Sequence, residues 1–405
     1  MIFSVAWRNI WRNKVRSLVV IFAVAIGLYA GVWSAAFMKG MMNQRIDKVI
    51  KTELSNIQVH NPEFRKTSEF ANYMGNASLL AKEISKLENV KGASNRIIIQ
   101  SMVASAETAA GVVIMGVDPE KEPLVTNLNT KIIDGSYFEG IKRNPVVIGK
   151  KLAEKLNVKI RSKIVITVQD LDNNITSGAF RIAGIYTTNN NIYDESHVFV
   201  RYSDLQGITE FPAGAGHEIA ISIEDNELLP KVQNEVSALA GNLEVMNWKE
   251  LSPEMSYLTE TMGMYMYIFI IIILLALLFG IINTMLMVVM ERRKEIGMLM
   301  AIGMQKFKIF RMIVVESILL SLVGGVVGII MGAAVAKIRS NHPIDLSMWA
   351  KGYEALGYDA YVYLYLEPSL LINVAVMVVI TGVIAALYPA YKALKNDPAD
   401  ALRME

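Results

Sequence analysis

The chain has 405 residues, of which 53% are apolar and 19% charged, with a mean hydropathy of +0.35 and a formal net charge of +2. Soluble domains usually carry about 45–50% apolar and about 25% charged residues, so this composition excludes a disordered chain. The absence of cysteine excludes a disulfide-stapled fold, and the near-neutral charge gives no reason to expect a nucleic-acid partner.

Residues 1–16 are predicted to form an amphipathic helix on the cytoplasmic side of a membrane. Phe3, Trp7, Ile10 and Trp11 recur at helical spacing, and Arg8, Arg12 and Arg16 lie elsewhere around the helix. Such a helix can lie among lipid headgroups, with tryptophan at the interface and arginine beside phosphates. Alternatively the segment only orients the span that follows, and the two roles are compatible.

Four apolar windows are each long enough to cross a bilayer, which takes roughly 20 mainly apolar residues. They are residues 17–38, 264–290, 312–336 and 368–391, and only the third contains a charge, Glu316. A cleaved signal peptide is the alternative for the first window. Its apolar stretch is longer than the usual ~7–15-residue core of such peptides, so a retained anchor is favoured. The predicted class is an α-helical membrane protein with four transmembrane helices.

Lysine and arginine near the span ends predict the orientation. They concentrate in the N-terminal segment, in residues 291–311 and in the tail 392–405, which are therefore expected on the cytoplasmic side. Residues 337–367 carry fewer and form the predicted external loop. The large insert, residues 39–263, is expected outside the cytoplasm, and the lack of cysteine suits an oxidising compartment.

The insert between the first two spans is predicted to be a large α+β domain. A strand–helix–strand order occurs twice, first over 55–60, 78–87 and 90–101, and again over 218–223, 226–240 and 243–248. The second helix is expected to turn Leu229, Val232, Val236 and Leu239 inward. Two such units could form one split α+β domain.

A β-rich stretch, about 112–205, lies between the two units and is predicted to be an inserted subdomain. Its expected elements are strands at 146–149, 164–168, 180–186 and 198–200, with a short helix at 150–156.

Motifs for catalysis or metal binding are lacking in the sequence. A phosphate-binding loop needs G-x-x-x-x-G-K-[ST], and residues 149–151 (GKK) fail on spacing and on the final residue. The four histidines show no metal-ligand spacing. Asp194, Glu195 and His197 are close in sequence, and a solvated turn is favoured there over a metal site. We therefore predict no catalytic residue, no metal and no directly bound cofactor.

Two features of the third span stand out. Glu316 is an intramembrane charge, which costs roughly 2.5–3.5 kcal/mol on insertion scales, so it needs a partner or a polar setting. It lies near the cytoplasmic end, which favours a structural or interfacial role over a transport role. Gly324, Gly328 and Gly332 recur every four residues and predict close helix packing, either within this chain's own bundle or against a second subunit.

Residues 291–305 (ERRKEIGMLMAIGMQ) form a short amphipathic segment on the cytoplasmic side. Its apolar residues are Ile296, Leu299, Met300 and Ile302. The segment is either a charged membrane-proximal loop or a docking helix, because spaced apolar residues are what a partner's groove binds.

Several stretches resemble the FtsX-type permeases of ABC transporters, the family of the macrolide exporter MacB and of LolC and LolE. Residues 291–303 resemble the family's E-R-x-x-E-I-G-x-x-x-A-x-G coupling segment, and Glu316-Ser317 with the glycines resembles its third span. The tail, 388–393 and 397–403, resembles its P-A-x-x-A…P-x-x-A-L-R ending. In the insert, 116–119, 146–153 and 183–188 follow the family's order, whereas residues 161–163 (RSK) depart from its Gly-Asp-Lys turn.

The resemblance implies a non-catalytic permease subunit in a bacterial inner (cytoplasmic) membrane, with its large domain in the periplasm. It implies a cytoplasmic ABC ATPase dimer that binds ATP and Mg²⁺, a second permease subunit (identical or not), membrane lipids and a periplasmic carrier or adaptor as partners. By the same resemblance, the ATPase docks on a set of coupling-segment residues. That set comprises Glu291, Arg292, Glu295, Ile296, Gly297, Leu299, Ala301 and Gly303.

The implied mechanism is mechanotransmission, in which ATP hydrolysis in the cytoplasm moves the external domain. Extraction of lipoproteins or other lipid-anchored cargo is the favoured use, because residues 56–62 (NIQVHNP) resemble the lipoprotein-release subunits. MacB-like efflux of drugs, peptides or other amphiphiles and an FtsX-like scaffold that regulates a cell-wall hydrolase are the alternatives.

Overall fold

The computed structural model describes residues 2–188, 190–349 and 358–395. It divides into two compact units. The first, here called the helical bundle, comprises the described residues of Met1–Asn43, Leu258–Met348 and Tyr361–Glu405. The second, here called the sheet domain, comprises Gln44–Tyr257 and the described residues of Trp349–Ala360. Residues 397–403 of the predicted tail motif lie outside the described residues.

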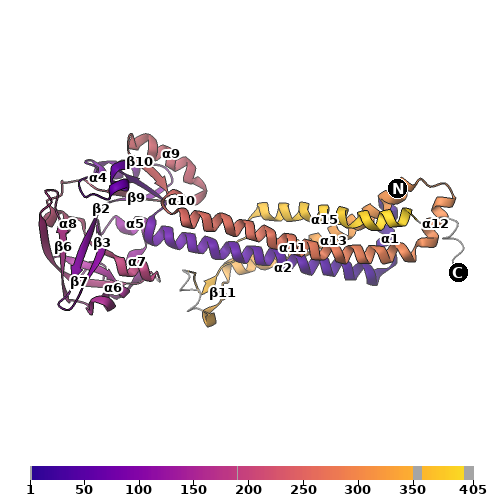
Figure 1. Ribbon diagram of the computed structural model, residues 1–405, viewed down its shortest axis with the longest axis horizontal. Coiled ribbons are helices and arrows are strands. Elements are labelled where there is room, and N and C mark those ends of the chain that lie inside the picture. Colours follow the sequence, from indigo (N-terminus) through magenta and orange to yellow (C-terminus); the bar gives the residue numbers. More distant parts are fainter. Residues whose placement is uncertain (1, 189, 350–357, 396–405) are drawn as a thin grey trace. The chain divides into compact units, whose positions relative to one another are not determined.

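Four long helices run side by side in the bundle (Figure 1). They are α2 (Lys14–Val49), α11 (Pro253–Glu291), α13 (Lys306–Asn341) and α15 (Pro368–Leu394). Each is long and apolar enough to cross a membrane. α2 and α11 extend well beyond the predicted windows, into residues assigned above to the insert. Hydropathy marks only the apolar part of a helix, whereas its backbone hydrogen bonds continue through polar residues.

Two short helices complete the bundle beside the long ones. α1 (Ile2–Arg12) ends earlier than the predicted residue 16, because the helix is interrupted by a turn at Asn13 before α2 begins. Ala6 and Ile10 of α1 are buried in the bundle core, whereas Trp7 and Trp11 are exposed with their rings edge to face at 6.0 Å. The other short helix is α12 (Arg293–Ala301). Between α13 and α15 lie strands β11 (Ile344–Asp345) and β12 (Tyr361–Val362) and the 3₁₀ turn η4 (Ser347–Trp349).

The sheet domain is built on ten strands in the order β10-β1-β9-β2-β3-β8-β5-β7-β4, with β6 pairing β2 and β7. They are β1 (Ile57–His60), β2 (Val90–Ala104), β3 (Ala109–Val117), β4 (Ile132–Gly135), β5 (Pro145–Gly149), β6 (Lys163–Gln169), β7 (Ile175–Tyr186), β8 (His197–Arg201), β9 (Glu218–Ile223) and β10 (Glu244–Asn247). The predicted strands appear within a few residues of these bounds, because alternating apolar residues mark half-buried strands directly. Strands β3 and β4 were not predicted.

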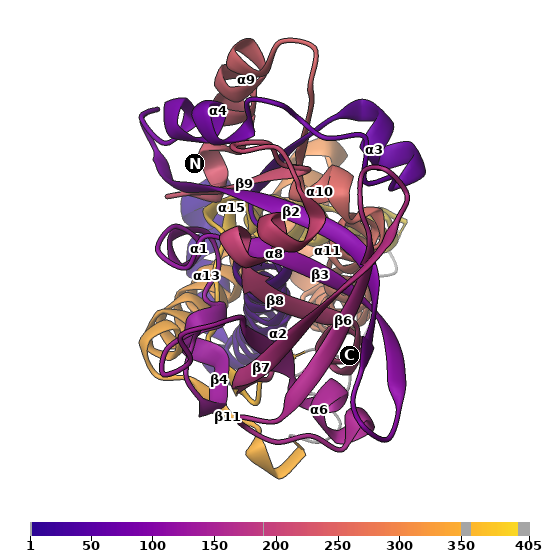
Figure 2. The same cartoon turned by 90° about the vertical axis from the view of Figure 1, so that its left-hand side faces the viewer.

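One long strand joins the two halves of the sheet (Figure 2). The first part of β2, through Arg96, pairs with β9, and its second part, from Ile97, pairs with β3. The β-rich half therefore begins inside β2 and not near residue 112 as predicted, because a continuous strand carries no sequence signal where its partner changes.

Short helices accompany the sheet. They are α3 (Pro62–Thr67), α4 (Ala77–Ile84), α5 (Glu122–Val125), α6 (Lys150–Leu156), α7 (Asn191–Ser196), α8 (Tyr202–Thr209), α9 (Leu229–Ala240) and α10 (Trp248–Leu251), with the turns η2 (Leu128–Lys131) and η3 (Asn226–Leu228). Leu229, Val232 and Val236 of α9 are buried as predicted, but Leu239 is exposed and Ala240 is buried in its place. Leu239 and Ala240 follow Val236 by three and four residues, and either spacing lies near the buried face of an α-helix.

Candidate functional site

The coupling segment forms the short helix α12 between α11 and α13. Its end is a Schellman motif, in which Gly303 N–H donates to the Met300 carbonyl at 3.1 Å and Met304 N–H donates to the Leu299 carbonyl at 2.9 Å. Gly303 has φ +93°, a left-handed conformation that favours glycine because it has no Cβ. This requirement gives the A-x-G part of the segment a physical reason.

The apolar residues of the segment face two directions. Ile296 is only 2% exposed and Gly297 is buried, while Leu299 and Met300 are half-buried and pack on the bundle core. Four large apolar residues in and just after the segment are exposed: Met298 on α12, Ile302 and Met304 in the turn that follows, and Phe307 in the first turn of α13. We call these four residues the docking face. Ile302 is 85% exposed, and its neighbours Ala301 and Gly303 are exposed as well.

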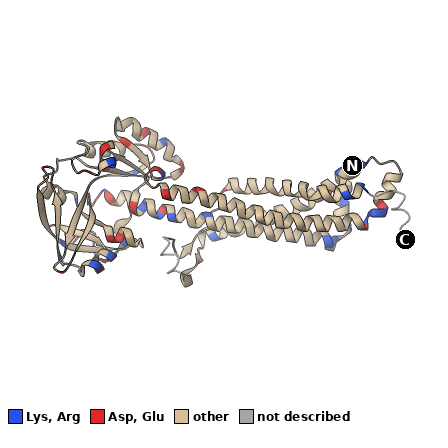
Figure 3. Cartoon of the chain, viewed as in Figure 1, with Lys and Arg blue, Asp and Glu red and all other residues tan. Residues whose placement is uncertain are grey.

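Basic residues are close to the docking face in the sequence. Lys294, Lys306 and Lys308 are exposed, and Figure 3 shows blue stretches of the ribbon at the end of the bundle that carries α12. Of the residues predicted to dock a partner, Ile296 and Gly297 therefore serve internal packing. The exposed apolar surface includes Ile302, which the sequence singled out, together with Met298, Met304 and Phe307, which it did not.

An ion-pair cluster links the coupling segment to the N-terminal helices. We call this cluster the clamp, and it comprises Asn9, Arg12, Arg16, Glu291, Arg292, Glu295 and Glu316. Arg12 Nη2 lies 2.7 Å from Glu295 Oε1, and Arg16 pairs with Glu291 through both guanidinium nitrogens. Arg292 then bonds Glu295 Oε2 at 3.0 Å and Glu316 Oε2 at 3.1 Å.

Asn9 completes the clamp from α1. With its amide oxygen turned toward Arg292, it accepts from Nη1 at 3.2 Å and from Nη2 at 2.9 Å. Burial acts to raise the pKa of Glu295, but hydrogen bonds from Arg12 and Arg292 outweigh it and leave this pKa below its ordinary value. A cavity of about 290 Å³ lies within the cluster and is lined by side chains from both sides of the clamp.

The clamp bears on two expectations from the sequence, and it revises one of them. Glu316 is 4% exposed and has a specific partner in Arg292, which agrees with a structural role for this charge. Arg12 and Arg16 were expected beside lipid phosphates, but they face Glu295 and Glu291. The available signal was an N-terminal segment with several arginines and no acid, far in sequence from a segment that contains Glu291 and Glu295.

The glycines of α13 pack against α2 of the same chain. A Cβ added to Gly324 would lie 2.8 Å from the Ile21 carbonyl oxygen, and one added to Gly328 would lie 2.5 Å from that of Ala25. Gly332 lies equally close to the Val32 side chain. Of the two alternatives left open by the sequence, the structure shows packing within the chain's own bundle.

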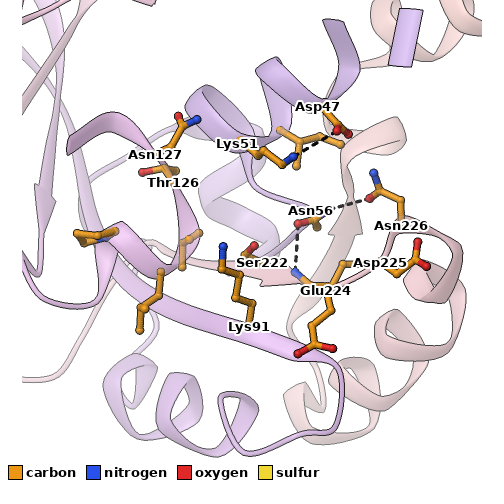
Figure 4. Close-up of a pocket in the computed structure, with 15 residues that line it drawn as sticks. Asp47, Lys51, Asn56, Lys91, Thr126, Asn127, Ser222, Glu224, Asp225 and Asn226 are labelled. Atoms are coloured by element: carbon orange, nitrogen blue, oxygen red, sulfur yellow. Dashed lines mark hydrogen bonds and ion pairs between the residues drawn. The ribbon is translucent and has the colours of Figure 1, made fainter. Parts of the chain in front are cut away.

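The end of α2 enters the sheet domain as a π-helical turn, η1 (Ile50–Leu54). Three hydrogen bonds hold this turn: Asn127 N–H donates to the Lys51 carbonyl at 2.7 Å, Thr52 Oγ1 donates to Asn127 Oδ1 at 3.0 Å, and Asn190 Nδ2 donates to Glu53. Figure 4 shows the polar pocket of about 420 Å³ beside it, where Asn56 bonds Asn226 and Lys51 pairs with Asp47. π-Turns often mark functional positions in helices.

Buried polar groups in the sheet domain are paired structurally. Arg96, at the point where β2 changes partner, bonds Glu122 and Glu218 at 2.5 Å each. Asp194 is 1% exposed and accepts from Thr188 N–H and Oγ1, so the predicted solvated turn is wrong for this residue. Within the described residues, no group of three His, Cys, Asp or Glu side chains could hold a metal ion.

Comparisons with known proteins agree with this architecture. Residues 267–398 match the family described as FtsX-like permease C-terminal, and residues 17–239 match the MacB-like periplasmic core domain. An uncharacterised ABC transporter permease of Methanocaldococcus jannaschii is 24% identical, over 100% of this chain and 98% of that protein. The lipoprotein-releasing system transmembrane protein LolC of Xylella fastidiosa is 20% identical, over 96% and 94% respectively.

Two further similarities differ in coverage. The pyoverdine export ATP-binding/permease protein PvdT of Pseudomonas syringae is 23% identical over 99% of this chain, but the chain spans only 59% of that protein's length. The crystal structure of the periplasmic region of MacB from Actinobacillus actinomycetemcomitans is similar over 54% of this chain and 98% of that one, at 11% identity and a TM-score of 0.35.

Four helices able to cross a membrane, with a large domain of the periplasmic type between the first and second, define a multi-pass membrane protein with an extracellular domain. Since the MacB-like match covers more than half of the chain and the FtsX-like match follows it, the chain belongs to the FtsX- and MacB-like family of ABC transporter permeases.

Proposed function

We propose that this permease couples ATP hydrolysis in a separate cytoplasmic ATPase, loaded with ATP and Mg²⁺, to movement of its external domain. It acts as a non-catalytic subunit in the cytoplasmic membrane, paired with a second permease chain. The observation that supports this most directly is the docking face: four large apolar side chains exposed on α12, on the turn that follows it and on the first turn of α13, in and beside the segment that resembles the family's coupling sequence. Apolar side chains exposed together in this way are typical of a surface that binds a partner.

The exposure of the docking-face residues decides which variant tests the proposal. Ile302→Glu places a charge at an 85% exposed position and leaves the bundle core untouched, whereas Leu299→Glu would also disturb packing. We expect Ile302→Glu to lose co-purification with the ATPase and stimulation of its hydrolysis. Ile192→Glu, at an equally exposed position in the sheet domain, is the matched control and should behave as wild type. Normal ATPase binding by Ile302→Glu would reject the docking assignment.

We propose that this permease extracts lipid-anchored cargo, such as a lipoprotein, from the membrane. The similarity to LolC supports it, because that protein matches almost end to end. In proteoliposomes that contain the permease, its ATPase and a labelled lipoprotein, ATP should release the lipoprotein to a soluble acceptor. Retention of the lipoprotein in the presence of ATP and active hydrolysis would exclude this cargo.

Export of an amphiphilic small molecule is the second candidate, supported by the similarity to the pyoverdine export protein. In that case the same proteoliposomes would move a labelled amphiphile and leave the lipoprotein in place. An FtsX-like scaffold is distinguished by activation of a cell-wall hydrolase with neither cargo moved.

A further inference from the structure

The coupling segment is attached to the rest of the bundle on two sides of different character. On one side Ile296 and Gly297 are buried against the helices of the core. On the side of α1 and α2, the cavity of about 290 Å³ separates the elements, and the clamp spans it. On this side, ion pairs across the cavity act beside the apolar contacts of the bundle core, which Ala6 and Ile10 of α1 share with Ile296.

The clamp has equal numbers of positive and negative side chains, and its ion pairs differ in how deeply they are buried. Its three arginines face three glutamates, and each arginine lies within 3.1 Å of a carboxylate oxygen. The Arg292 and Glu316 side chains are 13% and 5% exposed, the Arg16 side chain is 18% exposed, and the Arg12–Glu295 pair is open to solvent. Exposed pairs contribute little, whereas removing one partner of a buried pair leaves an uncompensated charge. Loss of Arg292 would therefore leave the buried Glu316 without a cation, whereas Arg16 is half-buried beside a Glu291 side chain that is 47% exposed.

Arg16 of the clamp belongs to α2, the helix that crosses the boundary at residues 43/44, where the sheet domain begins. Arg16 lies in the first turn of α2, and Ser17 Oγ of the same turn donates to the Ile10 carbonyl of α1 at 2.6 Å. At its far end, α2 passes into η1, whose backbone and side chains bond Asn127 and Asn190. One continuous helix thus begins at the ion pairs of the coupling segment and ends in hydrogen bonds of the sheet domain.

We propose that Arg12 and Arg16 are positioning residues that transmit displacement of the coupling segment to α2. α1 and the first turn of α2 are then part of the coupling apparatus and more than a surface anchor. The proposal rests on the proposed function, because it needs the segment to receive motion from an ATPase. It adds a second route for that motion, through side-chain ion pairs at residues 12 and 16, beside the covalent route through α11 and α13.

Charge swaps test the clamp. Arg16→Glu places two carboxylates face to face, and Arg16→Glu with Glu291→Arg restores the pair in the opposite sense. Arg8→Glu is the matched control, since it makes the same charge change at an exposed position of α1 with no ion pair seen among the described residues. In proteoliposomes with the ATPase, we expect Arg16→Glu to keep ATPase binding while the cargo moved per ATP falls at least about tenfold, equivalent to about 1.4 kcal/mol of lost coupling. The double variant should recover to near the wild-type value.

A second measurement does not depend on any ATPase or cargo. The chain has no cysteine, so Lys14→Cys and Lys294→Cys can carry a pair of spin labels in lipid nanodiscs. The distance distribution between α2 and α12 should be narrow in the wild-type background and with Arg8→Glu, broad with Arg16→Glu, and narrow again in the swapped variant. A distribution unchanged by Arg16→Glu, or a swap that restores neither distance nor coupling, overturns the clamp. Failure of wild-type protein to bind an ATPase, with the distances behaving as expected, would reject the proposed function and leave the ion-pair link intact.

Discussion

The imidazole of His217 is held in one tautomer by backbone groups on either side of it. Nδ1 accepts from Ile98 N–H at 3.2 Å, and Nε2 donates to the Phe70 carbonyl at 2.9 Å. The rings of Phe64, Phe70 and Phe211 surround it with centroids 4.6–5.1 Å away. Burial lowers the pKa of His217 to about 4, because a charged ring in this apolar cage would lose its hydration.

Acid should therefore destabilise the sheet domain through His217. Between pH 6.5 and about 4 the unfolded chain binds a proton at this histidine and the folded chain does not, so stability falls as the pH falls through that window. The contribution is roughly 3 kcal/mol. Denaturant unfolding of the purified protein at pH 7.5 and pH 5 should show the loss. His217→Phe should be less stable at pH 7.5 but depend less on pH, whereas the exposed control His342→Phe should keep the wild-type slope; an equal slope in His217→Phe would contradict the assignment.

The helices α2 and α13 approach each other closely because α13 has glycines at the contact. Gly324, Gly328 and Gly332 lie on one side of α13 and let the backbone of α2 approach. Ser317 and Ser321 continue this buried surface toward α15, where Ser317 Oγ donates to the Gly382 carbonyl at 3.0 Å. Small residues thus define the closest contact between α2 and α13, and large apolar residues such as Leu28, Leu274 and Leu320 fill the rest of the bundle core.

A leucine at Gly328 should force α13 away from α2. Its Cβ alone would lie 2.5 Å from the Ala25 carbonyl oxygen and 2.9 Å from the Leu28 Cβ, so neither helix can stay in place. Overpacking of this kind typically costs about 1–3 kcal/mol. Thermal unfolding in detergent should show the decrease for Gly328→Leu. Gly280→Leu is the matched control, because no atom lies within 4 Å of the added Cβ on α11, and a similar loss in that variant would argue against the contact.

At the scale of the whole molecule, two compact units share one chain. The sheet domain is unified by β2, and Arg96 is fully buried where that strand passes from β9 to β3. Its two carboxylate partners come from different halves: Glu218 begins β9, and Glu122 begins α5, which follows β3. The cluster therefore ties the halves together around a buried charge.

Replacing Arg96 should unfold one unit more readily than the other. Arg96→Met leaves Glu122 and Glu218 buried without a cation, which costs about 3–5 kcal/mol. Hydrogen–deuterium exchange of the intact protein should show faster exchange in β2 and β9, while the amides of α13 stay protected. Arg65→Met, at an exposed position of α3, should leave both units unchanged. Equal loss of protection in α13 would show that the units do not unfold independently.

The sequence by itself determined the class of the protein, its four spans and most strands. A membrane span is a continuous run of apolar residues and a half-buried strand alternates apolar and polar residues, so both can be recognised from residues that are neighbours in the chain. It also located the coupling segment and the glycine repeat. Short elements such as β4, α5, α7 and α8 escaped, since a few residues carry too little periodicity.

Only the tertiary structure decided which surfaces meet. It showed that Ile296 packs inward while Ile302 is exposed, that the glycines of α13 face α2, and that Arg12 and Arg16 find Glu295 and Glu291 some 280 residues away. Ion pairs and close helix contacts depend on groups brought together from distant parts of the chain. Spacing within a single segment therefore cannot reveal them, and the partners of each charge become visible only once the helices are packed.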